Sequence, residues 1–99
     1  SEVDYLRQNF ENANDRDRIW LLVLMYHMSP QSLKKYAMAD TLLELDPYNH
    51  YFQYVKGFQE EQFRRWESGS RYYIRAIELF PQYSDAMVNL GNCYDSLQQ

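Results

Sequence analysis

The fold is decided by a phrase that the chain uses twice, LLELDPYN at residues 42–49 and AIELFPQY at residues 76–83. When the two copies are aligned, an acidic residue, a leucine and a proline coincide, each 34 residues apart: Glu44 with Glu78, Leu45 with Leu79, and Pro47 with Pro81. Proline lacks the backbone N–H that a helix needs, and its ring clashes with the preceding turn. Each phrase therefore predicts a helix that ends just before a proline.

The same 34-residue period extends outward from these phrases. The equivalent columns are Val23 with Gly57 and Gly91, Trp20 with Tyr54 and Val88, Leu24 with Phe58 and Asn92, and Tyr26 with Glu60 and Tyr94. A fixed period of this length is the signature of a repeat protein, in which each repeat is one supersecondary unit. We predict that the unit is a pair of helices closed by a proline.

Helical patterns cover the whole chain, which has only three glycines and three prolines and no long apolar–polar alternation. Apolar spacing and capping signals predict six helices: about residues 1–14, 15–28, 29–46, 49–64, 71–80 and 84–99. In detail, we expect a turn at WESGS (residues 66–70), a cap at Ser84-Asp85, and a core face on the last helix made by Ala86, Leu90, Tyr94 and Leu97. The short connections predict that neighbouring helices run antiparallel.

Composition excludes several classes of protein. A chain of 99 residues with 45% hydrophobic residues predicts one small globular domain. The net charge of −4 and the lack of Lys/Arg clusters argue against binding of nucleic acid. The apolar run at residues 19–28 is shorter than the about 20 residues that a membrane-spanning helix takes, so we interpret it as a buried helix. The sequence does not identify the compartment, and a soluble, cytoplasmic protein is the favoured expectation. The chain does not begin with Met, and we expect it to be an excerpt of a longer one.

Residues with a family resemblance lie mainly in the second half of the chain. They are the phrase SDAMVNLGNCY at residues 84–94 and, before it, Gly57, Trp66, Tyr73, Ala76 and Pro81. On these residues the chain resembles the tetratricopeptide repeat (TPR) family, whose 34-residue unit has a small residue in its first helix, Ala in its second, and Pro at its end. The resemblance implies an all-α solenoid of antiparallel helix hairpins.

The resemblance also implies the domain organisation. A TPR-like domain at residues 15–99 would hold one repeat at 16–49, a second at 50–83, and a half repeat or capping helix at 84–99. The first repeat departs from the pattern, because Val23 replaces the small residue and Leu42 replaces the Ala. Residues 1–14 do not keep the phase, and we interpret them as an N-terminal packing helix.

In this family the first helices of successive repeats line a concave groove that receives a peptide. When the groove positions of the family are transferred to this sequence column by column, the resemblance implies a set of partner-binding residues. They are Trp20, Leu24, Tyr51, Tyr54, Phe58, Glu61, Val88 and Asn92, with Asp17, His27, Asp85 and Asp95 at the rim. Trp20 and Leu24 could equally be core residues beneath the N-terminal helix. For Tyr51, Tyr54 and Phe58 the core alternative also stands, although Phe52 and Val55 already supply a core face on that helix.

Candidate catalytic residues are few. His27 and His50 have no carboxylates at ligand spacing, so we interpret them as surface residues. Cys93 has no nearby His to activate it, and we expect a small buried thiol with neither an internal disulfide nor a cysteine zinc site. We therefore predict a module that binds a protein or peptide with apolar and basic residues, and no enzyme, metal or cofactor. A self-associating structural repeat, joined as a homodimer through the aromatic face, is the alternative, and a small helical enzyme or cofactor binder is a third hypothesis.

Overall fold

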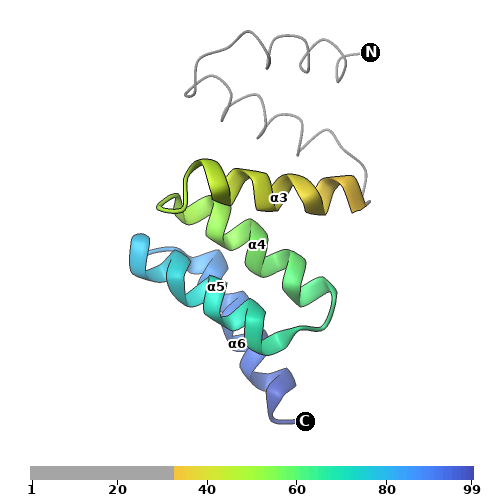
Figure 1. Cartoon of the computed structure of the whole chain (residues 1–99). Helices are drawn as coiled ribbons and strands as arrows, with labels where there is room; N and C mark the ends of the chain where they lie inside the picture. Colours follow the sequence, from red (N-terminus) through yellow and green to blue (C-terminus); the bar gives the residue numbers. More distant parts are fainter. Residues whose placement is uncertain (1–32) are drawn as a thin grey trace, which may run out of the picture. The chain divides into compact units, whose positions relative to one another are not determined.

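The computed structural model describes residues 33–99, and side chains within α3 from residue 38 onward. This part of the chain contains four α-helices and no strand: α3 (Leu33–Leu45), α4 (His50–Gln62), α5 (Trp66–Leu79) and α6 (Ser84–Leu97) (Figure 1). The all-α prediction is confirmed for this range. The helices predicted before residue 33 lie outside the described residues, and so do Trp20 and Leu24.

The chain divides into two compact units, Ser1–Leu45 and Asp46–Gln99. Within the first unit, α3 buries Ala39 and Leu42. It ends at Leu45, two residues before Pro47, as the repeated phrase predicts. Helices α4, α5 and α6 form the second unit, in which α5 packs against both of the other two.

Local capping explains where α4 begins. The Asn49 side chain accepts hydrogen bonds from the backbone N–H groups of Tyr51 (3.0 Å) and Phe52 (3.2 Å). These are donors that the first turn of a helix otherwise leaves unsatisfied. The predicted helix at about residues 49–64 is therefore confirmed to within two residues at each end.

The predicted turn at residues 66–70 is wrong, because α5 already begins at Trp66. The chain reverses earlier, at Arg64, whose φ of 59° lies in the left-handed region. Glycine and serine are typical turn residues, but Gly69 and Ser70 of this phrase are buried within α5. Ser70 stays inside the helix because its hydroxyl donates to the Trp66 carbonyl (2.7 Å).

Helices α4 and α5 approach closely at two glycines. A Cβ on Gly57 would lie 2.8 Å from the Tyr73 ring, and a Cβ on Gly69 would lie 3.3 Å from the Gly57 carbonyl oxygen. Gly91 occupies the same repeat column as Gly57, but a Cβ there would meet nothing within 4 Å. Gly91 therefore does not sit at a close helix crossing as Gly57 does, because no described helix covers that side of α6.

The core of the second unit is built from Tyr73, Ala76, Ala86 and Cys93, all fully buried. Leu90 packs against this cluster from α6. The predicted core face of α6 is correct at Ala86 and Leu90 but wrong at the other two positions, since Tyr94 and Leu97 are 45% and 50% exposed. Cys93 takes their place because it follows Ala86 by seven residues, which is two helical turns.

The start of α6 also differs from the prediction. Tyr83 is the N-cap residue, and no side chain caps the helix, so the cap expected at Ser84-Asp85 does not form. The Tyr83 carbonyl instead accepts the first hydrogen bond of the helix, from the Met87 N–H (3.2 Å). Because Tyr83 packs against the core, the helix start is set by packing of this aromatic ring.

Candidate functional site

A tyrosine cluster joins the three helices of the second unit. It consists of Tyr54 from α4, Tyr73 from α5, and Tyr83 at the start of α6. The Tyr54 ring centroid lies 5.6 Å from that of Tyr73 and 5.2 Å from that of Tyr83, both in tilted arrangements. Such pairs contribute about 0.5–1.5 kcal/mol each beyond the area they bury. The position of Tyr54 is therefore fixed by rings on two sides.

The cluster continues to the surface near the start of α4. The His50 ring lies 4.8 Å from the Phe80 ring and 5.1 Å from the Tyr83 ring. Phe80 and Tyr83 are themselves 5.8 Å apart. His50 is exposed, which confirms its interpretation as a surface residue. His27 lies outside the described residues.

A chain of hydrogen bonds runs through the tyrosine cluster. The Asn89 side-chain amide donates to the hydroxyl of Tyr54 (3.0 Å) and to that of Tyr73 (3.4 Å). The Tyr73 hydroxyl in turn donates to Glu61 Oε1 (2.8 Å). The Cys93 Sγ lies 3.9 Å from the same oxygen. Asn89 and Glu61 thus orient the hydroxyls of Tyr54 and Tyr73.

Electrostatics keep these groups protonated. Burial raises the pKa of Tyr54, and burial followed by the hydrogen bond and negative charge of Glu61 raises that of Tyr73. Burial, with smaller contributions from the neighbouring tyrosines, also raises the pKa of Tyr83. The pKa of the Cys93 thiol is raised by burial first and by the Glu61 charge second. All four side chains therefore remain neutral near pH 7, and Cys93 lacks the thiolate character that makes a cysteine reactive.

The structure places the sequence-predicted site residues in two groups. Those on α4 are half-buried: Tyr51, Tyr54, Phe58 and Glu61. Those on α6 are exposed, with Val88 at 64%. The hydrogen bond from Asn89 to Tyr54 brings the two helices together. Glu61 is one of the implied partner-binding residues, and its carboxylate already accepts a hydrogen bond from the Tyr73 hydroxyl.

Sequence reasoning did not include Tyr73, Tyr83 or Asn89 among the site residues. Asn89 directly follows Val88 in the sequence. The prediction selected only the positions that lie 34 residues from a groove residue, so it selected Val88 and left out Asn89. Tyr83 is the last residue of the second copy of the repeated phrase. That phrase served only to identify the 34-residue period. The signal that could have found them is the density of tyrosines and amides around one proline-ended phrase.

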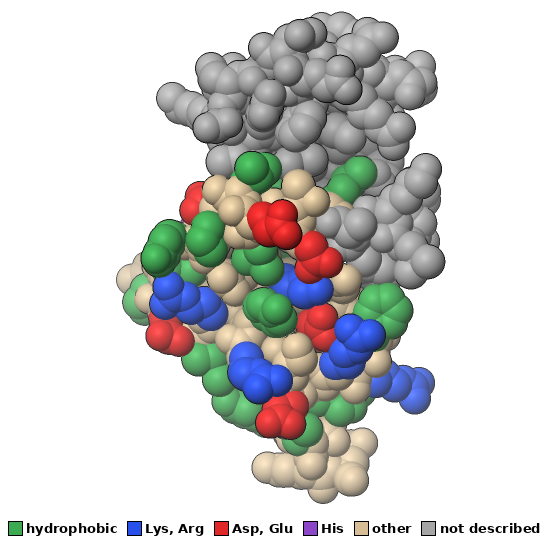
Figure 2. Space-filling model, in the orientation of Figure 1, with side chains coloured by type: hydrophobic (Ala, Val, Ile, Leu, Met, Phe, Trp, Pro, Cys, Tyr) green, Lys and Arg blue, Asp and Glu red, His purple; other side chains and the backbone are tan. Residues whose placement is uncertain are grey.

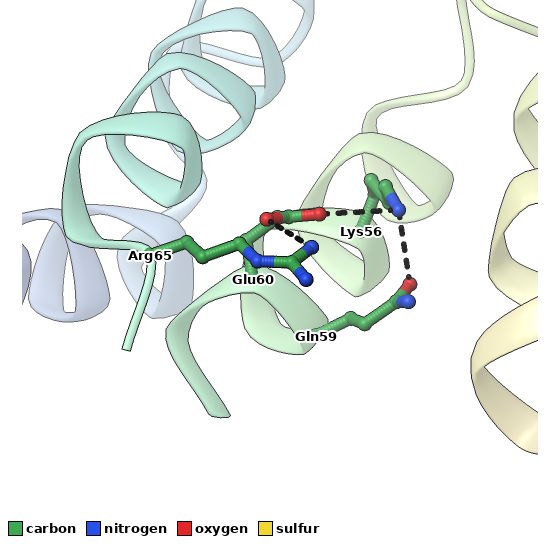
Figure 3. Close-up of polar contacts among 4 residues, drawn as sticks. All are labelled: Lys56, Gln59, Glu60 and Arg65. Atoms are coloured by element: carbon green, nitrogen blue, oxygen red, sulfur yellow. Dashed lines mark hydrogen bonds and ion pairs between the residues drawn. The ribbon is translucent and has the colours of Figure 1, made fainter. Parts of the chain in front are cut away.

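A second polar cluster lies on another part of α4 (Figure 3). The Lys56 ammonium lies 3.2 Å from Glu60 Oε1, and Arg65 lies 3.4 Å from Glu60 Oε2. Lys56 also donates to Gln59 Oε1 (3.4 Å). The side chains of Lys56 and Glu60 are only 11% and 6% exposed. A buried charge that is separated from its partner destabilises a protein. This ion pair therefore favours the packing of α4 in which Lys56 and Glu60 stay in contact.

Residues 33–99 lack two other kinds of site. No group of three or more His, Cys, Asp and Glu in this range is arranged to hold a metal ion. None of the helices in it combines the length and the apolar character that crossing a bilayer requires. Figure 2 shows acidic and basic side chains interspersed with hydrophobic ones on the visible face. Comparison of the sequence with protein-family models and with curated proteins finds no match.

Proposed function

We propose that the chain is a TPR-like α-solenoid of about six helices that binds a protein or a peptide. The 34-residue period supports the repeat, and the close packing of α4 on α5 at Gly57 supports the helix hairpin as its unit. The proposed binding surface within the second unit is the side of α4 and α6 that carries Tyr51, Tyr54, Phe58, Glu61, Val88 and Asn92. The family resemblance also implies Trp20 and Leu24, which lie outside the described residues.

The observation that carries this proposal is the half-buried ring of Tyr54, which is held in place where α4 meets α6. Tyr54 is held by two neighbouring rings and by the Asn89 amide, and Val88, adjacent to that amide in the sequence, is 64% exposed. A preorganised tyrosine offers contact area with little loss of side-chain freedom on binding. Such residues are enriched among those that dominate binding energy at interfaces.

The charge of α6 suggests the chemistry of the partner. Residues 84–99 contain Asp85 and Asp95, both exposed, and no Lys or Arg. A partner segment with Lys or Arg beside its apolar anchors would complement this surface and associate faster at low salt. The proposed ligand is therefore an apolar and basic peptide segment.

The proposal includes no catalytic step. The described groups with shifted pKa values are four tyrosines and Cys93, and each shift is upward. A general base or nucleophile needs a pKa near the working pH, and these shifts lead away from it. Ordered hydroxyls and amides that stay neutral suit recognition.

The test is selection of random peptides displayed on phage against the intact chain. We expect enriched peptides to combine aromatic or aliphatic residues with Lys or Arg. Their synthetic versions should bind Val88→Asp at least about tenfold more weakly, the loss typical of an interface anchor. Met87→Asp is the matched control, since Met87 is the preceding residue of α6 and is also exposed (46%). Equal binding by wild type and Val88→Asp would refute the proposed surface.

The alternative, a homodimer through the aromatic face, makes a different prediction for the free protein. Light scattering over a concentration series should then show a mass that rises toward twice that of one chain. Val88→Asp should abolish the rise, whereas a constant monomer mass would remove self-association from consideration.

A further inference from the structure

A carboxylate without a cationic partner lies at the edge of the tyrosine cluster. Asp85 is an exposed residue in the first turn of α6. Glu60 and Glu78 each have a basic partner, whereas no Lys or Arg among the described residues forms an ion pair with Asp85. An acidic residue at this position also offsets the positive end of the helix dipole. That role explains the carboxylate but not the groups that surround it.

Two tyrosine hydroxyls lie close to Asp85. Tyr83 precedes it by two residues, and the Tyr83 ring centroid is 5.2 Å from that of Tyr54. Asn89, whose amide donates to the Tyr54 hydroxyl (3.0 Å), comes four residues after Asp85 and so lies on the same side of α6. Burial is the main cause of the raised pKa of both tyrosines, and the negative charge of Asp85 adds to it. Asp85 is therefore near enough to interact with both hydroxyls.

These hydroxyls keep unused hydrogen-bonding capacity. The Tyr54 hydroxyl accepts from Asn89, but its own proton has no acceptor among the described residues. The Tyr83 hydroxyl makes no hydrogen bond in the same part of the chain. Both side chains are half-buried, and polar groups with restricted access to water gain from a partner. A ligand that bonds these oxygens and also carries a positive charge would satisfy all three groups.

The guanidinium of arginine has the chemistry that this arrangement requires. It presents five N–H donors in a planar fork, and two of them can bond one carboxylate in parallel. Further donors then remain for the hydroxyl oxygen of Tyr54 or Tyr83. The ammonium of lysine is a compact, strongly hydrated charge that lacks this fork. An anionic ligand would be repelled by Asp85.

The position of Val88 sets the spacing of the ligand. Asp85 and Val88 are three residues apart in α6, so their Cβ atoms lie about 5–6 Å apart on one side of the helix. In an extended peptide, every second side chain points to the same side, at intervals of about 6.5–7 Å. An arginine and an aliphatic residue two positions apart can therefore contact Asp85 and Val88 together.

We propose that Asp85, with the hydroxyls of Tyr54 and Tyr83, binds an arginine side chain of the partner peptide, and that this arginine lies two positions from the aliphatic residue that contacts Val88. The three groups are called the Asp85 site. This inference rests on the proposed function, because it names the residue that one end of the same binding surface recognises.

The probes are tripeptides with blocked ends, titrated into the intact chain and followed by the NMR shifts of its backbone amides. Arg-Ala-Leu and Leu-Ala-Arg present the two anchors at the proposed spacing in both chain directions. In the control peptides, Gln or Lys replaces Arg, Ala replaces Leu, or the Arg and Leu are adjacent. We expect one of the two Arg–Leu tripeptides to give saturable shifts at Asp85 and Val88.

Replacing Arg by Gln in that tripeptide should weaken binding roughly two- to fivefold, the range expected for an exposed ion pair. Lys should give a smaller loss. Asp85→Asn should make the Arg and Gln tripeptides bind equally. Asp95→Asn is the matched control, since it removes the same charge from an exposed position of the same helix and should keep the preference for Arg.

Tyr83→Phe tests the hydroxyl separately from the fold. The urea midpoint should stay close to that of wild type, because the hydroxyl has no hydrogen bond among the described residues. Binding of the Arg tripeptide should weaken, while binding of the Gln tripeptide should not change. A fall of both affinities by the same factor would contradict a bond between this hydroxyl and the arginine.

Several results would overturn the Asp85 site. Equal binding of the Arg and Gln tripeptides by wild type would remove the arginine, and equal losses in Asp85→Asn and Asp95→Asn would reduce the effect to net charge. Tighter binding by the tripeptide with adjacent anchors would refute the spacing. In each case, weaker binding when Ala replaces Leu would leave the proposed function standing. Absence of binding by every tripeptide would refute the site, and the phage selection would still decide on the proposed function.

Discussion

The same substitution at two equivalent glycines should have opposite effects on stability. Gly57→Ala places a Cβ 2.8 Å from Cδ1 and Cε1 of Tyr73, closer than packed carbon atoms can lie. The ring cannot easily move away, since Tyr73 is fully buried and its hydroxyl is bonded to Glu61 and Asn89. Overpacking of this kind costs roughly 1–3 kcal/mol. Gly91→Ala meets open space instead.

The magnitude is clearest as a difference between the two variants. Replacing Gly by Ala within a helix contributes about 1 kcal/mol of stability through backbone preference. This gain is common to both sites and cancels, so the difference in free energy of unfolding should equal the overpacking cost of roughly 1–3 kcal/mol. Gly91→Ala alone should stabilise the chain by about 1 kcal/mol.

The assay is urea unfolding followed by circular dichroism, with midpoints and slopes compared among wild type, Gly57→Ala and Gly91→Ala. A difference of 1 kcal/mol corresponds to a change in melting temperature of roughly 4–8 °C for a domain of this size. Equal shifts for both variants, or a more stable Gly57→Ala, would refute the close crossing of α4 and α5.

Three further predictions follow from the polar contacts. Tyr73→Phe should destabilise the chain by about 1–3 kcal/mol because the half-buried Glu61 carboxylate loses its hydroxyl donor and the Asn89 amide loses one of its two acceptors. A change below the error of urea unfolding would contradict the hydrogen-bond chain. Glu60→Ala should cost more stability than Arg65→Ala, because Glu60 and its partner Lys56 have side chains only 6% and 11% exposed, whereas the Arg65 side chain is 61% exposed and its loss should cost less than about 1 kcal/mol. Comparable losses in the two variants would contradict the burial of the Lys56–Glu60 pair. The pKa of Tyr73 is raised in the folded state, so the stability that this residue contributes is fully present below pH 10.0, the ordinary pKa of tyrosine, and is lost as the pH rises through the higher pKa of the folded state. Urea midpoints above pH 10 should therefore fall less in Tyr73→Phe than in wild type. Parallel curves of midpoint against pH would contradict the raised pKa.

The sequence predicts the helix ends more reliably than the side-chain network. Pro47 and Pro81 stop helices by local chemistry, so the ends of α3 and α5 follow from the repeated phrase alone. Asn49 caps α4 in the same local way. The start of α5 could not be predicted locally, because Gly69 is there to let α4 approach and not to make a turn.

The candidate site shows the same division. The 34-residue columns identify Tyr54 and Val88 as equivalent, but equivalence does not reveal what each side chain contacts. The bond from Asn89 to Tyr54 joins residues 35 positions apart, and it depends on how three helices are arranged. Gly57 and Gly91 share a column yet differ in burial, because burial depends on the neighbouring helix and not on the residue itself.

The short connection between α4 and α5 has a consequence for the order of folding. Only Phe63, Arg64 and Arg65 separate the two helices, so closing the hairpin costs little loop entropy. Its packing contact, Gly57 with Tyr73, spans 16 residues, whereas the bond that ties α6 to α4 spans 35. Local contacts form faster than distant ones. We therefore expect the α4–α5 hairpin, and the equally local contact of α5 with α6 at Tyr73 and Asn89, to form before the bond between α4 and α6.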